Sequence, residues 1–206
     1  MQPRDNACMG LPDPYDVAAY DAHMGEMTVG PPEPLASPIV VCDYDPGWPD
    51  LYQHEAARIL GALGKRAIRI EHVGSTSVPG LPAKPIIDIV LEVPDSADEP
   101  AYAGDLESAG YALHIREPSW LEHRMFRPSG AAGVSGTGVH LHVFGAGCPE
   151  IDRMVLFRDH LRASAADREL YARVKHELAT REWKYMQQYA DAKSSVVAEI
   201  MARATA

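Results

Sequence analysis

Long hydrophobic runs are missing from this sequence of 206 residues. No window approaches the roughly 18 to 20 consecutive apolar residues that a helix needs to cross a bilayer, so we expect a soluble protein with no membrane partner. The N-terminus lacks a basic segment followed by an apolar run, and we therefore expect no secretory signal and a cytoplasmic location. Cysteine is also scarce, because Cys8, Cys42 and Cys148 are odd in number, far apart and in no CxxC arrangement. This pattern argues against a disulfide framework and against a zinc knuckle.

Positive charge is scarce as well, since 19 lysines and arginines stand against 29 acidic residues and give a formal net charge of -10. A chain this acidic is a poor candidate for general nucleic-acid binding through its overall electrostatic field. The imbalance is strongest in residues 1–38, which hold six acidic residues and one arginine and are rich in proline and glycine. We interpret residues 1–38 as an extension outside the core fold, either a disordered tail or a segment draped over it, and residues 39–206 as the folded domain.

Hydrophobic periodicity over residues 39–206 predicts a mixed β-sheet with packed helices and a helical C-terminal portion, which makes an α+β domain. Strands are predicted where apolar residues alternate or run together in β-rich segments, at residues 39–42, 67–74, 85–93, 111–117, 122–128 and 139–145. Helical segments are predicted where apolar residues recur at helical spacing, at residues 50–63, 96–109, 150–183 and 185–203.

The stretch HVGSTSVPGLPAKPIIDIVLEV, residues 72–93, places an ionisable side chain inside an apolar strand. Gly74 lets the backbone approach a ligand closely, and hydroxyl donors follow it, so this turn can hold phosphate oxygens. The hydroxyl residues are Ser75, Thr76 and Ser77. Asp88 in the following strand can hold a divalent metal that bridges such oxygens. The stretch is not a P-loop, because no Gly-Lys-Ser/Thr sequence occurs in it.

This arrangement resembles the Gly-Ser and Asp-hydrophobic-Asp-hydrophobic signature of the DNA polymerase beta-like nucleotidyltransferase superfamily. More closely, the chain resembles the GrpB-like family of predicted nucleotidyltransferases. Over residues 39–203 the following segments fit that family in order: YDPGWP, IEHVGSTSVPGLPAKPIIDI, EPSWLEHRMF, HLHVF, LFRDHLR, YARVKHELA and YADAKSSVVAEI. The resemblance implies a nucleotidyltransferase fold, a nucleoside triphosphate and a small-molecule acceptor as partners, and a divalent metal as cofactor, either Mg or Mn, with Zn as a further option.

One departure from the superfamily pattern bears on metal binding. The superfamily strand carries two acids at alternate positions, but here Val90 stands at the alternate position after Asp88. Glu92 lies two positions further, roughly 6 to 7 Å along the strand, which argues against shared coordination. His140 and His142 are two apart on a predicted strand and point to one face, so they would replace the missing ligand if their strand lies near that of Asp88.

The resulting ligand set of Asp88, His140 and His142, extended by His72 or His123, suits Mn or Zn better than Mg, which prefers oxygen ligands. The alternative is that the two strand histidines hydrogen-bond within the sheet or contact phosphate. For catalysis we select Asp88 and His142, the latter as a candidate general base.

Basic residues are candidates for a wall around the phosphates of an anionic substrate. They are Lys84, Arg124, Arg158, Arg162, Lys175 and Lys193. The alternatives are a solvated loop lysine at position 84 and helix arginines paired with surface acids such as Asp159. Asp88 also has a structural alternative, which is an ion pair with Lys84 or Arg124.

Two classes of function remain. The preferred hypothesis is a metal-dependent nucleotidyltransferase, which the resemblance implies. The competing hypothesis is a non-catalytic module that binds a nucleotide or another anionic ligand and has lost turnover along with the second carboxylate. Val90 favours the module, whereas the Gly-Ser turn, Asp88 and the histidines favour the enzyme. The sequence indicates neither the acceptor nor the oligomeric state.

Overall fold

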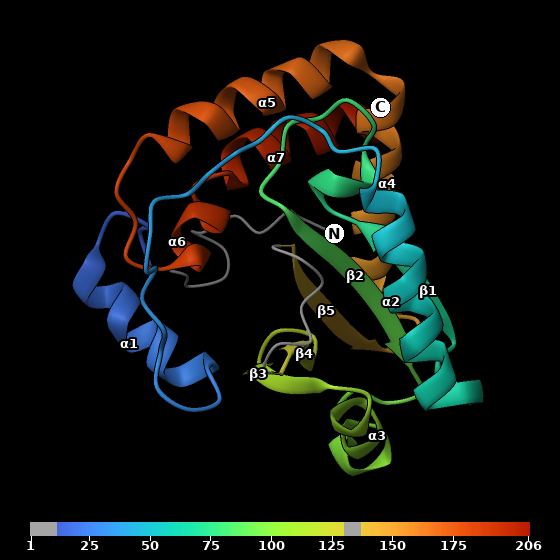
Figure 1. The fold of residues 1–206 in the computed structure, drawn as a ribbon. Coiled ribbons are helices and arrows are strands. Elements are labelled where there is room, and N and C mark those ends of the chain that lie inside the picture. The colour runs from blue at the N-terminus through green and yellow to red at the C-terminus, as the bar shows by residue number, and fades with distance from the viewer. Residues whose placement is uncertain (1–11, 130–136) are drawn as a thin grey trace.

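The computed structural model describes residues 12–129 and 137–206, and Figure 1 shows their fold. Residues 1–11, the first part of the expected extension, lie outside the described residues. Five strands form one mixed sheet in the order β1-β2-β5-β4-β3, as expected for an α+β domain. β2 and β5 are parallel, and the other neighbouring strands are antiparallel. The strands are β1 (Arg69–Val73), β2 (Ile86–Val93), β3 (Tyr111–Glu117), β4 (His123–Pro128) and β5 (Gly138–Gly145).

The two faces of β2 have different neighbours, because successive side chains of a strand point to opposite faces. One face packs on α2 (Trp48–Leu63) and on α3 (Ala103–Ser108) to form the main core. The buried residues of this core include Ile87, Ile89, Leu91, Trp48, Ile59 and Leu106. Asp88 and Val90 therefore point to the other face.

The C-terminal helices cover that other face. They are α4 (Pro149–Ala163), α5 (Ala165–Ala179), α6 (Met186–Asp191) and α7 (Ser194–Ala204). The predicted helical segment 150–183 is divided at Ser164, whose side chain caps α5 by accepting a hydrogen bond from the backbone N–H of Asp167. α5 and α7 lie side by side (Figure 1) and share a hydrophobic cluster with Val78 and Leu81 of the loop after β1. The loop after β1 is thereby fixed against the helices.

A helix, α1 (Val17–Met27), lies within the segment expected to be an extension. Its residues Tyr20, Met24 and Met27 recur at helical spacing and are buried against β3, β4 and the start of α6. Within this segment, α1 therefore packs against the core. The average composition of residues 1–38 hides this helix, because the prolines lie on both sides of it and residues 15–29 contain none.

Two element predictions were wrong. Residues 39–42 form no strand, and Cys42 makes only an isolated bridge to Ala83, because its neighbour there is the loop before β2. The predicted helix 96–109 is shorter, since a single 3₁₀ turn (Glu99–Ala101) that contains Pro100 precedes α3. Within the described residues, no helix has the length and apolar character needed to span a bilayer.

Candidate functional site

A cavity of about 690 Å³ lies between the sheet and the C-terminal helices. Strands β2, β3, β4 and β5 line its floor, and the turn after β1, helices α4 to α7 and residues 33–36 line its other sides. Its volume is in the range of sites that hold small-molecule ligands. Nine residues selected from the sequence line it: Gly74, Ser75, Lys84, Asp88, His123, His140, His142, Lys175 and Lys193.

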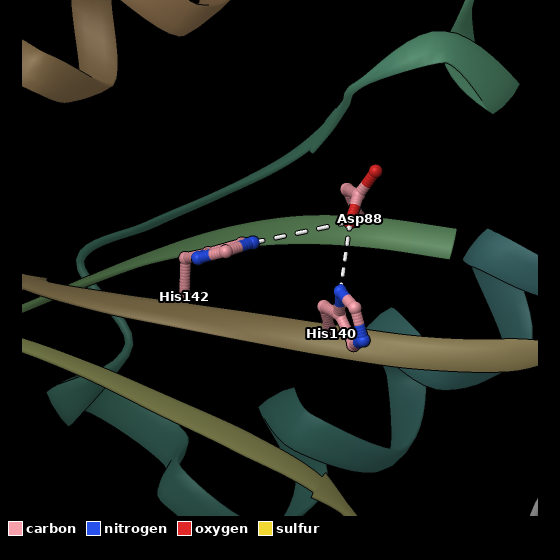
Figure 2. A group of neighbouring side chains, drawn as sticks. All are labelled: Asp88, His140 and His142. Carbon is pink, nitrogen blue, oxygen red and sulfur yellow. Dashed lines mark ion pairs between the residues drawn. The ribbon is translucent and has the colours of Figure 1, made fainter. Parts of the chain in front are cut away.

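Asp88, His140 and His142 form one group on the floor of this cavity (Figure 2). In the parallel register Asp88 lies opposite His140, and the alternation of β5 places His142 on the same face. Asp88 Oδ1 is 3.4 Å from His140 Nδ1 and 3.9 Å from His142 Nε2. The side chains are 28%, 17% and 22% exposed, respectively, so all three are accessible to a ligand in the cavity.

The charge states of this group favour a bound cation. Burial alone would raise the pKa of Asp88, but the interactions with His140 and His142 outweigh burial and hold that pKa below its usual range. Burial lowers the pKa of His140 to about 4, although the adjacent Asp88 opposes this change. At neutral pH the group therefore presents an ionised carboxylate beside a neutral imidazole, the form in which histidine binds metals.

Gly74 lies directly against Asp88. Val73 pairs with Asp88 in the antiparallel register of β1 and β2, and Gly74 follows with a φ of 68°. A Cβ atom at position 74 would lie 2.2 Å from Asp88 Oδ2, so a side chain there would displace the carboxylate. The turn that follows is a single 3₁₀ turn (Ser75–Ser77), in which Ser75 lines the cavity and its Oγ accepts a hydrogen bond of 3.0 Å from Lys175 Nζ.

The other two hydroxyls of this turn are buried and stabilise the turn itself. Thr76 Oγ1 donates a 3.0 Å hydrogen bond to the carbonyl oxygen of Ile86 and contacts His72 Nε2 at 3.0 Å. Ser77 Oγ donates to the carbonyl oxygen of Gly74 at 2.6 Å. His72 does not line the cavity, and burial lowers its pKa to about 4. Ser75 therefore faces the cavity, whereas Thr76, Ser77 and His72 hold the backbone of the turn in place.

The second carboxylate of the superfamily pattern has no substitute on β2. Val90 is 1% exposed and packs in an apolar cluster with Val73, Phe144 and Ile151. Glu92 Oε1 accepts a 2.8 Å hydrogen bond from the backbone N–H of Gly147, away from Asp88. The two histidines of β5 are therefore the side chains that the structure brings beside Asp88.

Behind His142 lies a chain of hydrogen bonds that sequence reasoning missed. His142 Nδ1 is 3.0 Å from His123 Nε2, and His123 Nδ1 is 2.7 Å from Glu117 Oε2. We assign the protons from this network: Glu117 accepts from His123 Nδ1–H, and His123 Nε2 accepts from His142 Nδ1–H. The other ring nitrogen of His142, Nε2, faces Asp88. His123, an expected additional ligand, thus supports His142 from behind. Glu117 is the first residue of the family segment EPSWLEHRMF, but no role was predicted for it from the sequence.

Three lysines face the cavity without forming an ion pair with any described residue. Lys84 Nζ and Lys193 Nζ lie 4.7 Å and 4.5 Å from the centroid of the Tyr189 ring. Burial first, and then the charge of Lys193, lowers the pKa of Lys84 to about 7. Burial first, and then the charges of Lys193 and Lys84, lower the pKa of Lys175 to about 6. Three neighbouring lysines without a carboxylate partner among the described residues lack counter-charge, and an anionic ligand would supply it.

The three arginines selected from the sequence are not brought to the cavity. Arg124 points to the opposite face of β4 and pairs with Glu99 at 2.5 Å. Arg158 pairs with Glu71 at 2.9 Å, and Arg162 donates to the carbonyl oxygen of Ser77 at 2.8 Å. Arg162 thereby stabilises the turn from outside. Arg124 therefore pairs with Glu99 and not with Asp88, and the ion-pair partners of Asp88 are His140 and His142 (Figure 2).

Two other arginines do line the cavity. Arg153 of α4 is paired with Glu150 at 2.5 Å. Arg127 lies on the same face of β4 as His123 and Met125, since the three are spaced by two residues. The spacing of His123 and Arg127 in the sequence predicts that they share a strand face, but it was not used to select Arg127.

The chain is similar in sequence to known proteins. Residues 38–203 match the GrpB protein family. The chain is 56% identical over 186 residues to the UPF0157 protein BH1888 of Halalkalibacterium halodurans, which covers 90% of this chain and 92% of that protein. It is 46% identical over 178 residues to the UPF0157 protein SCO7215 of Streptomyces coelicolor, with 86% and 89% covered.

Solved structures agree on the fold. The conserved protein GrpB from Enterococcus faecalis superposes with a TM-score of 0.67 and 29% identity, over 80% of this chain and 96% of that chain. The GLD-2/RNP-8 complex gives a TM-score of 0.51 at 16% identity, with 76% and 58% covered. The MgGTP-bound Cid1 poly(U) polymerase gives 0.50 at 12% identity, with 82% and 49% covered. At these identities the last two similarities concern the nucleotidyltransferase-like fold alone.

Proposed function

The chain belongs to the GrpB protein family, and from that membership we propose that it is a metal-dependent nucleotidyltransferase. It moves a nucleotidyl group from a nucleoside triphosphate to a small acceptor. The observation that carries the proposal is the close contact between Gly74 and Asp88, at the floor of a cavity that also holds unpaired lysines. The fold similarity to the Cid1 poly(U) polymerase supports it.

The turn after β1 and the lysines bind the triphosphate. Lys175 Nζ already donates to Ser75 Oγ, so a phosphate oxygen near Ser75 is within reach of a hydroxyl and of an ammonium group. Lys84 and Lys193 flank the Tyr189 ring nearby. Bound phosphate supplies the missing counter-charge and favours the protonated form of these lysines.

Asp88, His140 and His142 fit a divalent metal. Their ligand atoms lie within 4.8 Å of one another, close to the roughly 4 Å that separates two ligands each about 2 Å from a shared ion. One carboxylate with two imidazoles suits Mn or Zn better than Mg. Bound there, the metal would neutralise charge on the phosphate oxygens. Glu117 and His123 orient His142 for this role, as outer hydrogen-bond partners of metal ligands do.

The transfer itself forms a bond between an acceptor oxygen and the α-phosphorus. The bond between the α-phosphorus and its bridging oxygen to the β-phosphate breaks, and pyrophosphate leaves toward the lysines. The acceptor's proton passes to solvent water, or to His142 Nε2 when that lone pair holds no metal, because the nitrogen has only one lone pair to offer.

Release of labelled pyrophosphate tests this proposal. The protein is incubated with each γ-labelled nucleoside triphosphate, with Mn, Mg or Zn, and with a filtered small-molecule cell extract as the source of acceptor. We expect release that depends on the metal and is lost in Asp88→Asn. Asp43→Asn is the matched control, because Asp43 is an exposed carboxylate remote from the cavity. Release that persists in Asp88→Asn would rule out the assigned role.

A second candidate function is a non-catalytic module that binds a nucleotide or another anionic ligand. The burial of Val90 in an apolar cluster favours it, because this face of β2 then offers one carboxylate to the cavity. The two candidates differ in one outcome. The module binds the triphosphate and gives no pyrophosphate with any metal, whereas the enzyme turns it over.

A further inference from the structure

Arg127 is a cavity residue to which the proposed transfer has so far given no role. It follows His123 and Met125 on the cavity face of β4, and Phe126 pairs with Leu141 of β5. Continuation of that antiparallel register places Arg127 beside His140. The guanidinium thus lies at the edge of the Asp88, His140 and His142 group.

The side chain of Arg127 is charged and incompletely satisfied. Its Nε atom is buried and has no hydrogen-bond partner among the described residues. Arg124 and Arg153, by contrast, each pair with a carboxylate within hydrogen-bond distance. Glu33 is the acid that influences Arg127 electrostatically, but it is exposed and forms no ion pair with it. A buried donor without an acceptor destabilises the folded state unless a ligand satisfies it.

The position of Arg127 separates it from the turn that binds phosphate. Across the sheet the order is Gly74 at the end of β1, Asp88 on β2, His140 on β5 and Arg127 on β4. Neighbouring strands lie about 4.8 Å apart, so β1 and β4 are separated by roughly 14 Å. Ser75 and Lys175 are therefore on one side of the metal-binding group and Arg127 is on the other. In a transfer reaction these two sides hold the leaving group and the acceptor.

The surroundings of Arg127 indicate the kind of molecule that fits. His114 of β3 lines the same end of the cavity, and burial lowers its pKa, so a neutral imidazole is available for a hydrogen bond. Pro34 and Leu35 add apolar lining to the cavity. A guanidinium offers a planar pair of N–H donors that matches a carboxylate or a phosphate group. The cavity of about 690 Å³ must also hold the nucleotide, so this end takes only a small molecule.

We propose that Arg127 and His114 form the acceptor subsite, and that the acceptor is a small hydroxy compound with a carboxylate or phosphate group. The identification as an acceptor rests on the proposed nucleotidyl transfer, whereas the anion site itself rests on the unpaired guanidinium. Arg127 binds the anionic group, and the acceptor hydroxyl points toward Asp88 and the α-phosphorus.

Thermal shift with two kinds of ligand tests this subsite. Glycerol 3-phosphate and D-glycerate represent the phosphate and the carboxylate, glycerol is the neutral analogue, and ATP with Mn represents the nucleotide. The variants are Arg127→Met and Lys175→Met, and Arg173→Met is the control because Arg173 is exposed. The whole chain is used throughout.

We expect at least one of the two anions, but not glycerol, to raise the melting temperature of the wild type. Arg127→Met should lose this response, with affinity weakened about ten- to hundredfold, and should keep the response to ATP with Mn. Lys175→Met should show the reverse pattern, and Arg173→Met should keep both. The melting temperature of ligand-free Arg127→Met should be unchanged or higher, because the substitution removes a buried, unpaired charge.

Four results would overturn the subsite: no stabilisation by either anion, equal stabilisation by glycerol, loss of the ATP response in Arg127→Met, or a strong destabilisation of that ligand-free variant. If Arg127→Met fails to fold, the same thermal-shift measurement is made with Arg127→Lys. This variant retains the positive charge but lacks the planar pair of donors, so it should bind the anion more weakly than the wild type does. If the anion response depends on Arg127 but no nucleoside triphosphate binds, the anion site stands and the transfer reaction fails. If the nucleotide binds and neither anion does, only the subsite fails.

Discussion

Gly74 and Asp88 are in such close contact that a Cβ atom on the glycine would lie 2.2 Å from a carboxylate oxygen of the aspartate. The turn that is expected to bind phosphate and the carboxylate that is expected to bind metal are therefore fixed relative to each other by adjacent strands. A side chain at position 74 must disturb both, and its φ of 68° adds backbone strain.

Gly74→Ala should lower the free energy of unfolding by about 1 to 3 kcal/mol and abolish nucleotide binding. The control is Gly61→Ala in α2, where a Cβ meets no atom within 4 Å, and it should be neutral or slightly stabilising. Urea unfolding and nucleotide thermal shift measure the two effects. A Gly74→Ala variant that binds nucleotide as the wild type does would show that the turn and Asp88 do not act together.

Glu117→Gln should weaken metal affinity about ten- to hundredfold, because His123 loses the carboxylate that orients it behind His142. Glu107→Gln is the control, since Glu107 is an exposed residue of α3. Titration calorimetry with Mn or Zn gives the affinities. Equal affinities for the wild type and Glu117→Gln would mean that the hydrogen-bond chain does not position the ligand.

The stability of the ligand-free protein should depend on Lys175 and on pH. Burial lowers the pKa of Lys175 from 10.5 to about 6 in the folded chain. Between these values the unfolded chain binds a proton that the folded chain lacks, so this lysine makes the free energy of unfolding rise with pH across the window.

Lys175→Met should therefore raise the melting temperature near pH 7, and its stability should rise less steeply with pH. Lys65→Met, at an exposed lysine, should retain the wild-type slope. Melting curves from pH 6 to pH 10 provide the comparison. A variant with an unchanged slope would indicate that Lys175 is protonated in the folded, ligand-free protein.

Met24→Ala should destabilise the fold by about 2 to 4 kcal/mol, because Met24 is buried with Ile115 and Met125 against the sheet. Val17→Ala, at an exposed position of the same helix, should change stability by less than about 0.5 kcal/mol. Unfolding in urea measures both. If Met24→Ala and Val17→Ala change stability equally little, residues 12–38 are dispensable for folding.

The sequence predicted the strands of the sheet well because alternation of side chains is a local property. It also predicted that His140 and His142 share a face, but not that β5 lies parallel beside β2, which is what brings them to Asp88. Strand order depends on contacts between distant segments, so no single segment contains it. The sequence therefore left the proximity of these two strands as a condition, and the pairing of β2 with β5 meets it.

The basic residues show where local patterns fail. Arg124 directly follows His123 and so points to the opposite face, whereas Arg127 is an even number of positions away and shares the cavity. Arg158 and Arg162 share a helix face, but only the packing of α4 decides that this face meets Glu71 and the turn after β1. Helix α1 was missed because the prolines on both sides of it hide it in the average composition of residues 1–38.

Calorimetric titration of a nucleoside triphosphate into the protein, with and without Mn, tests the central claim most directly. The wild type should bind the nucleotide tightly only with Mn, since Asp88 and the two histidines hold the cation beside the phosphates. Asp88→Asn should fold with unchanged or higher stability, because a desolvated charge is removed, and should lose the Mn-dependent affinity, while Asp43→Asn keeps it. Nucleotide binding of equal affinity in Asp88→Asn, or binding that is independent of Mn in the wild type, would contradict the account.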